Sequence, residues 1–148
     1  MVWGCMSANG VGNLVIIVGI MDQYVYRNIL EANVLQSAEK LGLAEGFIFQ
    51  QDNDPKHTSK YAKKFFEEAY VELLDWVNRS PDLNPMENLW RKVKVELNKK
   101  TRSNIEQRKA QILEVWHSIS PEFLTKLVKS MPKRLKKVIL QKGSPLGY

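Results

Sequence analysis

The chain of 148 residues has the length of one ordinary domain, and its 44% hydrophobic content is enough for a packed core. Its single cysteine, Cys5, excludes an intrachain disulfide and favours a reducing intracellular compartment. The longest apolar run, residues 14–21, is too short to cross a bilayer, and no signal peptide is evident, so we expect no membrane association.

Charge divides the chain into two unlike parts. Residues 1–90 carry 7 Lys and Arg against 12 Asp and Glu, a net charge of −5, whereas residues 91–148 carry 15 against 4, a net charge of +11. A basic C-terminal part suits contact with phosphate backbones, although solvated helix faces would give the same composition. We therefore expect one domain with a strand-rich α/β part, 1–90, and a basic helical part, 91–148.

The first 42 residues predict a β-hairpin followed by a helix. The segments 2–8 and 13–19 are β-rich, and Asn9-Gly10 between them favours the positive φ of a tight turn. Asp22 is a suitable N-cap for a helix that ends at Gly42. The apolar residues at helical spacing between them are Val25, Ile29, Leu30, Val34, Ala38 and Leu41.

The middle of the chain predicts a β-α-β alternation. A strand over residues 47–51 leads into Asp54-Pro55, which offers an N-cap and a first-turn proline to a helix over residues 55–69. The segment VELLDW, residues 71–76, follows as another strand.

The remainder predicts helices. One begins at Pro85 after the N-cap Asn84, and Ser103 with Glu106 has the spacing of a capping box for the next. The last begins at Ser120-Pro121, and Pro132 kinks or restarts it. The apolar residues expected to be buried are Met86, Leu89, Trp90, Val93 and Leu97, then Ile105, Ile112, Leu113, Trp116 and Ile119, then Leu124, Leu127, Val128 and Met131. This order of elements indicates an α/β domain with a helical C-terminal layer.

Asp52 and Glu87 are the candidate functional carboxylates. Asp52 follows the predicted strand, where open α/β sheets present functional groups, but it could equally satisfy backbone N–H groups of its turn. Glu87 is the third residue of its helix, where its carboxylate could instead complete a capping box with Asn84. Position alone leaves a structural and a catalytic role open for both residues.

The residues around both carboxylates are similar to one protein family. The blocks QQDNDPKHTS, residues 50–59, and SPDLNPMENLW, residues 80–90, resemble the two signature blocks of the Tc/mariner superfamily of DDE transposases. The 34 residues between Asp52 and Glu87 match the spacing of that family's second aspartate and final glutamate. The resemblance extends upstream to MVWGCMSANGVGNL, residues 1–14, and more weakly downstream to residues 118–139, so it covers nearly the whole chain.

The resemblance implies a ribonuclease H-like fold and metal-dependent DNA cleavage and strand transfer with Mg²⁺ or Mn²⁺. Hard divalent ions take oxygen ligands, and two such ions clamp the attacking and leaving oxygens of an in-line displacement. Asp52 and Glu87 would be the catalytic metal ligands in this chain. The implied location is the nucleus, and the implied partner is DNA held by non-specific backbone contacts.

Several basic residues are candidates for nucleic-acid contact. His57 could face the metal site or a phosphate, or else face solvent. The lysines near it could line a DNA channel or form a solvated helix face, and the segment PKRLKK, residues 132–137, could be a nuclear-localisation signal or the solvated face of a helix. The candidates are Lys56, Lys60, Lys63, Lys64, Lys133, Arg134, Lys136 and Lys137.

One departure from the family concerns its first catalytic aspartate. In the family it lies on a first strand that precedes the segment VWGC, with which these residues begin, so the resemblance implies an incomplete ribonuclease H-like fold without its first strand. We therefore expect little cleavage activity from these residues alone, an aggregation-prone sheet edge, and possible association with a full-length transposase. The alternative function is a non-catalytic module that binds nucleic acid or a transposase.

Overall fold

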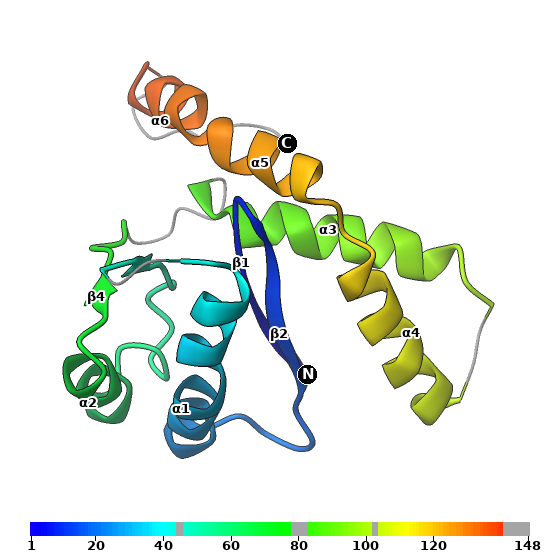
Figure 1. Ribbon diagram of the computed structural model, residues 1–148, viewed down its shortest axis with the longest axis horizontal. Helices are drawn as coiled ribbons and strands as arrows, with labels where there is room; N and C mark the ends of the chain where they lie inside the picture. Colours follow the sequence, from blue (N-terminus) through cyan, green and yellow to red (C-terminus); the bar gives the residue numbers. More distant parts are fainter. Residues whose placement is uncertain (44–45, 78–82, 102–103, 141–148) are drawn as a thin grey trace. The chain divides into compact units, whose positions relative to one another are not determined.

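The computed structural model describes residues 1–43, 46–77, 83–101 and 104–140, and it has a mixed α/β architecture with several helices (Figure 1). The chain forms two compact units. The first contains Met1–Cys5 and Gly12–Arg79, and the second contains Met6–Val11 and Ser80–Tyr148. Both the expected Ser80-Pro81 segment and Ser103 lie outside the described residues.

The chain begins with the predicted β-hairpin, formed by β1 (Val2–Ser7) and β2 (Gly10–Ile16). Its turn occupies Ala8 and Asn9, one position earlier than expected. Among the described residues, positive φ values occur at Tyr70 and at three glycines that do not include Gly10. The expected positive φ at Asn9-Gly10 is therefore wrong, because Gly10 already belongs to the second strand.

The predicted first helix is confirmed as α1 (Gln23–Lys40). The Asp22 carboxylate accepts hydrogen bonds from the backbone N–H groups of Tyr24 and Val25, which is the expected N-cap. Gly42 has a φ of +62°, as a left-handed residue just beyond a helix end requires. The expected apolar face is buried except for Val25, which is half-buried, and Tyr26 and Ser37 are buried with it.

The two later strands are shorter than predicted. β3 (Ile48–Phe49) and β4 (Glu72–Leu73) form a parallel pair in which Ile48 lies opposite Glu72 and Phe49 opposite Leu73. The described strands thus form two separate two-stranded sheets, β1-β2 and β3-β4.

Helix α2 (Lys60–Glu68) begins five residues later than the predicted start at residue 55. Asp54 forms a turn instead of a helix N-cap, since its backbone carbonyl accepts the N–H groups of His57 and Thr58. Ser59 then supplies the N-cap, and its hydroxyl accepts a hydrogen bond from the N–H of Ala62. The Asp-Pro dipeptide was a valid local signal, but Ser59 provides a second cap beyond the turn.

The core of the first unit lies among the hairpin, α1 and α2. Leu30 and Ala62 are fully buried, and Phe49 of β3 packs its ring 5.2 Å from that of Phe66. Arg27 of α1 also forms a 2.8 Å salt bridge with Glu68 of α2. The buried residues of this core are Trp3, Ile17, Tyr26, Ile29, Leu30, Val34, Ala62, Phe65, Phe66 and Val71. Both two-stranded sheets therefore contribute side chains to the same core.

The helices of the second unit are α3 (Pro85–Asn98), α4 (Ile105–His117), α5 (Pro121–Lys129) and α6 (Met131–Leu140). Asn84 caps α3 and Ser120 caps α5, both as predicted. The restart at Pro132 is confirmed, because α5 ends at Lys129 and α6 begins at Met131. Thr125 of α5 also donates a 2.9 Å hydrogen bond to the Ala8 carbonyl at the hairpin tip.

Helix α4 has a different cap from the one predicted. Asn104 and Gln107 form a complete capping box, so the expected role of Glu106 is wrong. Trp116 and Ile119 are buried as expected, and the rings of Trp90 and Trp116 stack 5.2 Å apart. Ile105 is instead 75% exposed, because helical periodicity identifies an apolar face but not how far along it a neighbouring element packs.

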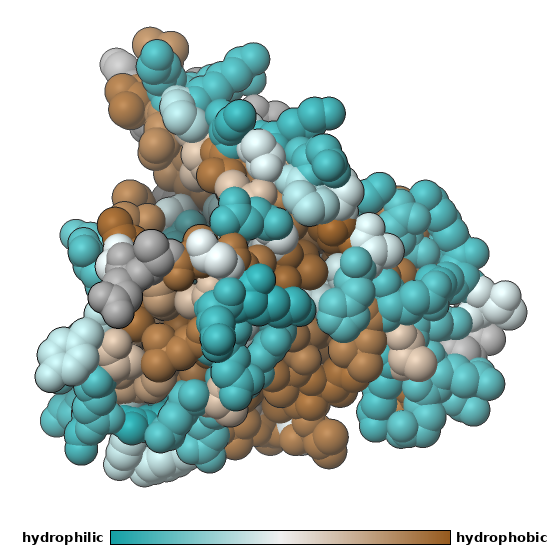
Figure 2. Space-filling model, in the orientation of Figure 1, coloured by the Kyte–Doolittle hydropathy of each residue, from teal (hydrophilic) through white to brown (hydrophobic). Residues whose placement is uncertain are grey.

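Hydrophobic side chains also lie at the surface. Figure 2 shows hydrophobic surface over the hairpin and the segment that follows β2. In this region Met1, Val18 and Ile20 are exposed, the latter two at 87% and 88%. Within the described ranges, no helix is both long and apolar enough to cross a membrane.

Candidate active site

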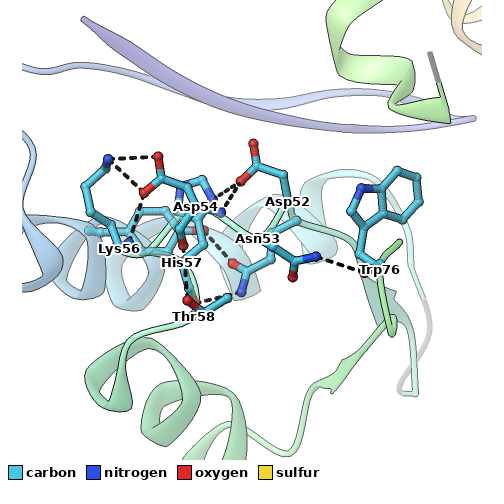
Figure 3. Close-up of polar contacts among 9 residues, drawn as sticks. Asp52, Asn53, Asp54, Lys56, His57, Thr58 and Trp76 are labelled. Atoms are coloured by element: carbon cyan, nitrogen blue, oxygen red, sulfur yellow. Dashed lines mark hydrogen bonds and ion pairs between the residues drawn. The ribbon is translucent and has the colours of Figure 1, made fainter. Parts of the chain in front are cut away.

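Asp52 lies in the irregular segment between β3 and α2, three residues beyond the end of β3. The expectation that it directly ends a strand is therefore wrong. One carboxylate oxygen, Oδ1, accepts hydrogen bonds from the Asp54 backbone N–H at 3.1 Å and from His57 Nδ1 at 2.5 Å (Figure 3). The other oxygen has no hydrogen-bond partner among the described residues, and the side chain is 51% exposed. One oxygen is thus fixed while the other can accept a ligand.

His57 faces Asp52 and not solvent. Its side chain is 18% exposed, and its ring packs 4.2 Å from the Tyr26 ring. Since a carboxylate oxygen can only accept, Nδ1 carries the proton in this contact. Of the two expected orientations, the structure therefore has the one toward the candidate metal ligand.

Tyr26 and Gln51 complete this arrangement, although no sequence pattern marks them as site residues. The Tyr26 hydroxyl donates a 2.6 Å hydrogen bond to Gln51 Oε1, and Gln51 Nε2 donates a 3.0 Å bond to the His57 carbonyl. Burial raises the pKa of the Tyr26 phenol above its usual range, so the hydroxyl remains a donor. Gln51 lies next to Asp52 in the sequence, but Tyr26 comes from α1 and no local pattern connects it to the site.

Asp54 and Lys56 form a separate ion pair within the same turn. Lys56 Nζ lies 2.8 Å from Asp54 Oδ1, and the Lys56 backbone N–H donates to the same carboxylate. Partial burial acts to raise the pKa of Asp54, but the hydrogen bonds from Lys56 outweigh it and lower that pKa. Lys56 is therefore engaged in the turn, whereas the sequence left a DNA channel and a solvated helix face open for it.

The other basic candidates occupy different environments. Lys60 and Lys63 of α2 are exposed, whereas Lys64 lies 3.6 Å from Glu68 in a salt bridge. In α6, Lys133 and Lys136 are exposed and Lys137 is half-buried.

Arg134 of α6 is a structural residue. Its side chain is buried, and it donates a 2.6 Å hydrogen bond to Asn88 Oδ1 and a 2.9 Å bond to Ser130 Oγ. The guanidinium therefore joins α6 to the first turns of α3. Its burial distinguishes Arg134 from the exposed Lys133 and Lys136, with which the sequence grouped it.

Glu87 lies in the first turn of α3, where Asn84 accepts the N–H of Met86. The Glu87 carboxylate is exposed. Among the described residues, it accepts no hydrogen bond from the Asn84 backbone N–H and has no other hydrogen-bond or salt-bridge partner. A carboxylate at a helix N-terminus is favoured by the helix dipole. Glu87 belongs to the second unit and Asp52 to the first.

The carboxylate oxygens of Asp52 and Glu87 fit hard divalent cations in their donor chemistry. The uncommitted oxygen of Asp52 is the clearest such donor. Within the described part of the chain, no cluster of three or more His, Cys, Asp and Glu side chains is placed to hold a metal ion. Asp52 is the candidate carboxylate of the first unit and Glu87 that of the second.

Known proteins are similar to this chain over its whole length. It is 45% identical to the Tcb1 transposase of Caenorhabditis briggsae and 40% identical to the Tc1 transposase of Caenorhabditis elegans, each over 148 residues. The chain spans 54% of the length of both relatives.

A similar fold occurs in the catalytic domain of Mos1 mariner transposase, with a TM-score of 0.87 at 20% identity over 98% of this chain and 74% of that one. This likeness supports the expected ribonuclease H-like fold. Mos1 catalytic domains have also been solved with raltegravir and Mn or Mg, and Mos1 transposase in a paired-end complex with the left transposon end.

The family described as DDE superfamily endonuclease matches residues 5–109, which include both candidate carboxylates. This match covers most of the chain. The chain therefore belongs to the DDE superfamily endonucleases, as part of a Tc1/mariner transposase catalytic domain.

Proposed function

We propose that this chain supplies two carboxylate ligands, Asp52 and Glu87, to the divalent metal ions with which a transposase cleaves and joins DNA. The observation that carries the proposal is the Asp52 carboxylate, which has one oxygen fixed by His57 and the Asp54 N–H and the other available. A bound pair of Mg²⁺ or Mn²⁺ ions would stabilise the attacking and leaving oxygens of the displacement.

The sheet arrangement supports a finer proposal about the fold. The two sheets, β1-β2 and β3-β4, pack on one core, but in the described part of the chain they are not joined by hydrogen bonds into one sheet. An additional strand that carries the third carboxylate would join them and complete the metal site. Such a strand would be provided by polypeptide ahead of Met1 or by a partner transposase. Residues 1–148 in isolation would then have little or no cleavage activity.

A nicking assay tests this proposal. Supercoiled DNA with Mn²⁺ is expected to remain intact with the isolated chain, whereas Mn²⁺ binding is expected and is weakened by Asp52→Asn. Metal-dependent nicking by the isolated chain that is lost in Asp52→Asn would show that two carboxylates suffice. Unchanged Mn²⁺ affinity in Asp52→Asn would refute the ligand role of Asp52.

A second candidate function is non-catalytic binding to DNA. It is favoured by the net charge of +11 over residues 91–148 and by the exposed Lys133 and Lys136. Because each neutralised phosphate releases counterions, affinity should fall steeply with salt, and neutralising both lysines should reduce the salt slope by about two. Arg134→Ala serves as a comparison that removes charge from a buried position. Salt-independent binding would argue against an electrostatic contact with the phosphate backbone.

We also propose that the protein acts in the nucleus, where a DNA-processing enzyme meets its substrate. The exposed lysines of α6 are the candidate import signal. A fluorescent fusion that stays nuclear after neutralisation of Lys133 and Lys136 would assign import to another segment.

A further inference from the structure

We propose that Tyr26 and Gln51 are positioning residues. They hold His57, and His57 in turn orients the Asp52 carboxylate that would bind the metal ion. This inference rests on the proposed function of Asp52 as a metal ligand. It concerns two residues that do not touch the metal ion themselves, and it assigns the orientation of the site to α1 as well as to the turn.

The contacts form a continuous chain from the core to the carboxylate. Tyr26 is 1% exposed and donates from its hydroxyl to Gln51 Oε1 at 2.6 Å. Gln51 Nε2 donates to the His57 carbonyl at 3.0 Å, and His57 Nδ1 lies 2.5 Å from Asp52 Oδ1. The Tyr26 ring also packs against the imidazole at 4.2 Å. His57 is thus held both through its backbone and through its ring.

Each hydrogen bond in this series has one chemically allowed direction from donor to acceptor. The phenol can only donate to the amide oxygen, which turns the amide N–H group of Gln51 toward the His57 carbonyl. The imidazole, in turn, donates from Nδ1 to Oδ1 and thereby occupies that oxygen. The remaining oxygen of Asp52 keeps its lone pairs for a cation, in the way that partners of metal ligands commonly orient them.

The position of Tyr26 explains why the arrangement would be rigid. Tyr26 lies near the start of the 18-residue helix α1, on the same buried face as Ile29 and Leu30. The segment from residue 50 to 59, by contrast, contains neither helix nor strand. An anchor in the core fixes a turn that regular secondary structure does not fix.

Two variants on the same helix give a matched test. Tyr26→Phe keeps the ring and removes the hydroxyl that bonds Gln51. Tyr24→Phe removes an exposed hydroxyl whose partner is the Tyr61 hydroxyl at 3.3 Å. A third variant, Gln51→Met, removes both hydrogen bonds of the Gln51 side-chain amide while keeping a side chain of similar length.

Two readouts separate positioning from stability. The chain has two histidines, so long-range ¹H–¹⁵N NMR spectra can report the His57 tautomer with His117 as an internal reference. Mn²⁺ affinity is measured in parallel by water-proton relaxation on each folded variant. We expect both Tyr26→Phe and Gln51→Met to shift the His57 nitrogen resonances. Tyr26→Phe should weaken Mn²⁺ binding roughly two- to tenfold, as for one lost hydrogen bond, and Gln51→Met should weaken it at least as much. Tyr24→Phe should change neither.

The outcomes distinguish the two claims. Tyr26→Phe and Gln51→Met that match Tyr24→Phe in both readouts would overturn the positioning role. In a different outcome, the His57 resonances shift but Mn²⁺ affinity is insensitive to Asp52→Asn. That result would support the hydrogen-bonded arrangement and refute its role in metal binding, because Asp52 would not be a metal ligand. If Tyr26→Phe does not fold, Gln51→Met decides the question, since Gln51 is only half-buried.

Discussion

Substituting Gly12 by alanine should destabilise the first unit through a steric conflict at a single point. A Cβ atom at Gly12 would lie 2.5 Å from Cys5 Sγ, 2.8 Å from Ser37 Cβ and 2.9 Å from Ser37 Oγ. Comfortable carbon contacts are about 3.5–4.0 Å, so each of these neighbours must move by several tenths of an ångström or more. Ser37 Cβ is attached directly to α1 and moves only with that helix.

The expected cost follows from two contributions. Overpacking of this kind costs about 1–3 kcal/mol. Displacing Ser37 also weakens the 3.0 Å hydrogen bond that its Oγ accepts from the Asn13 N–H, a further loss of about 1 kcal/mol. We therefore expect Gly12→Ala to lower the free energy of unfolding by roughly 2–4 kcal/mol.

Urea unfolding followed by circular dichroism measures this cost, and Cys5→Ala provides the control. Removing the sulfur eliminates the shortest contact, so Gly12→Ala should cost at least about 1 kcal/mol less in the Cys5→Ala background. A Gly12→Ala protein within about 0.5 kcal/mol of the parent would refute the steric argument. Equal costs in both backgrounds would show that the conflict with Cys5 is not the cause.

Three further predictions concern other elements. Trp116→Ala should cost about 3–5 kcal/mol in urea unfolding, because the ring is fully buried against another indole; a loss below about 1 kcal/mol would contradict that packing. Tyr70→Gly should raise stability by up to about 1 kcal/mol, since Tyr70 has a φ of +53° and is 94% exposed, whereas Tyr70→Ala should not. Hydrogen bonds from Lys92 and Lys99 lower the pKa of Glu96 to about 2. The stability that the ionised Glu96 contributes is therefore complete above the ordinary pKa of a glutamate and is lost as the pH falls toward 2. In acid unfolding, Glu96→Gln should lack this pH-dependent loss of stability, and a profile unchanged from the parent would refute the prediction.

Local signals predicted those elements whose caps and apolar faces agree. Asp22 with Gly42 bounds α1, and Asn84 with Pro85 begins α3, as the sequence indicated. The start of α2 was misplaced because two competent caps, Asp54 and Ser59, lie five residues apart. Only the tertiary contacts of the turn decide between them.

The site was predictable only in its carboxylates. Asp52 and Glu87 stand in recognisable blocks, but the contact between His57 and Asp52 depends on the shape of an irregular turn. The contribution of Tyr26 depends on packing between segments 25 residues apart in the sequence. Likewise, Arg134 was grouped with exposed lysines because charge patterns do not reveal that one member is buried.

Two hydrogen bonds of the second unit determine the order in which it can be completed during synthesis. The hydrogen bond to the Ala8 carbonyl at the hairpin tip can form only after Thr125, 117 residues later, has been synthesised. The bond to Asn88, beside Glu87, likewise requires Arg134, 46 residues later. Chains emerge from the ribosome N-terminus first. The helix that presents Glu87 therefore gains this contact only after α6 has been synthesised, and a chain that stops before α6 would leave this carboxylate on an incompletely packed helix.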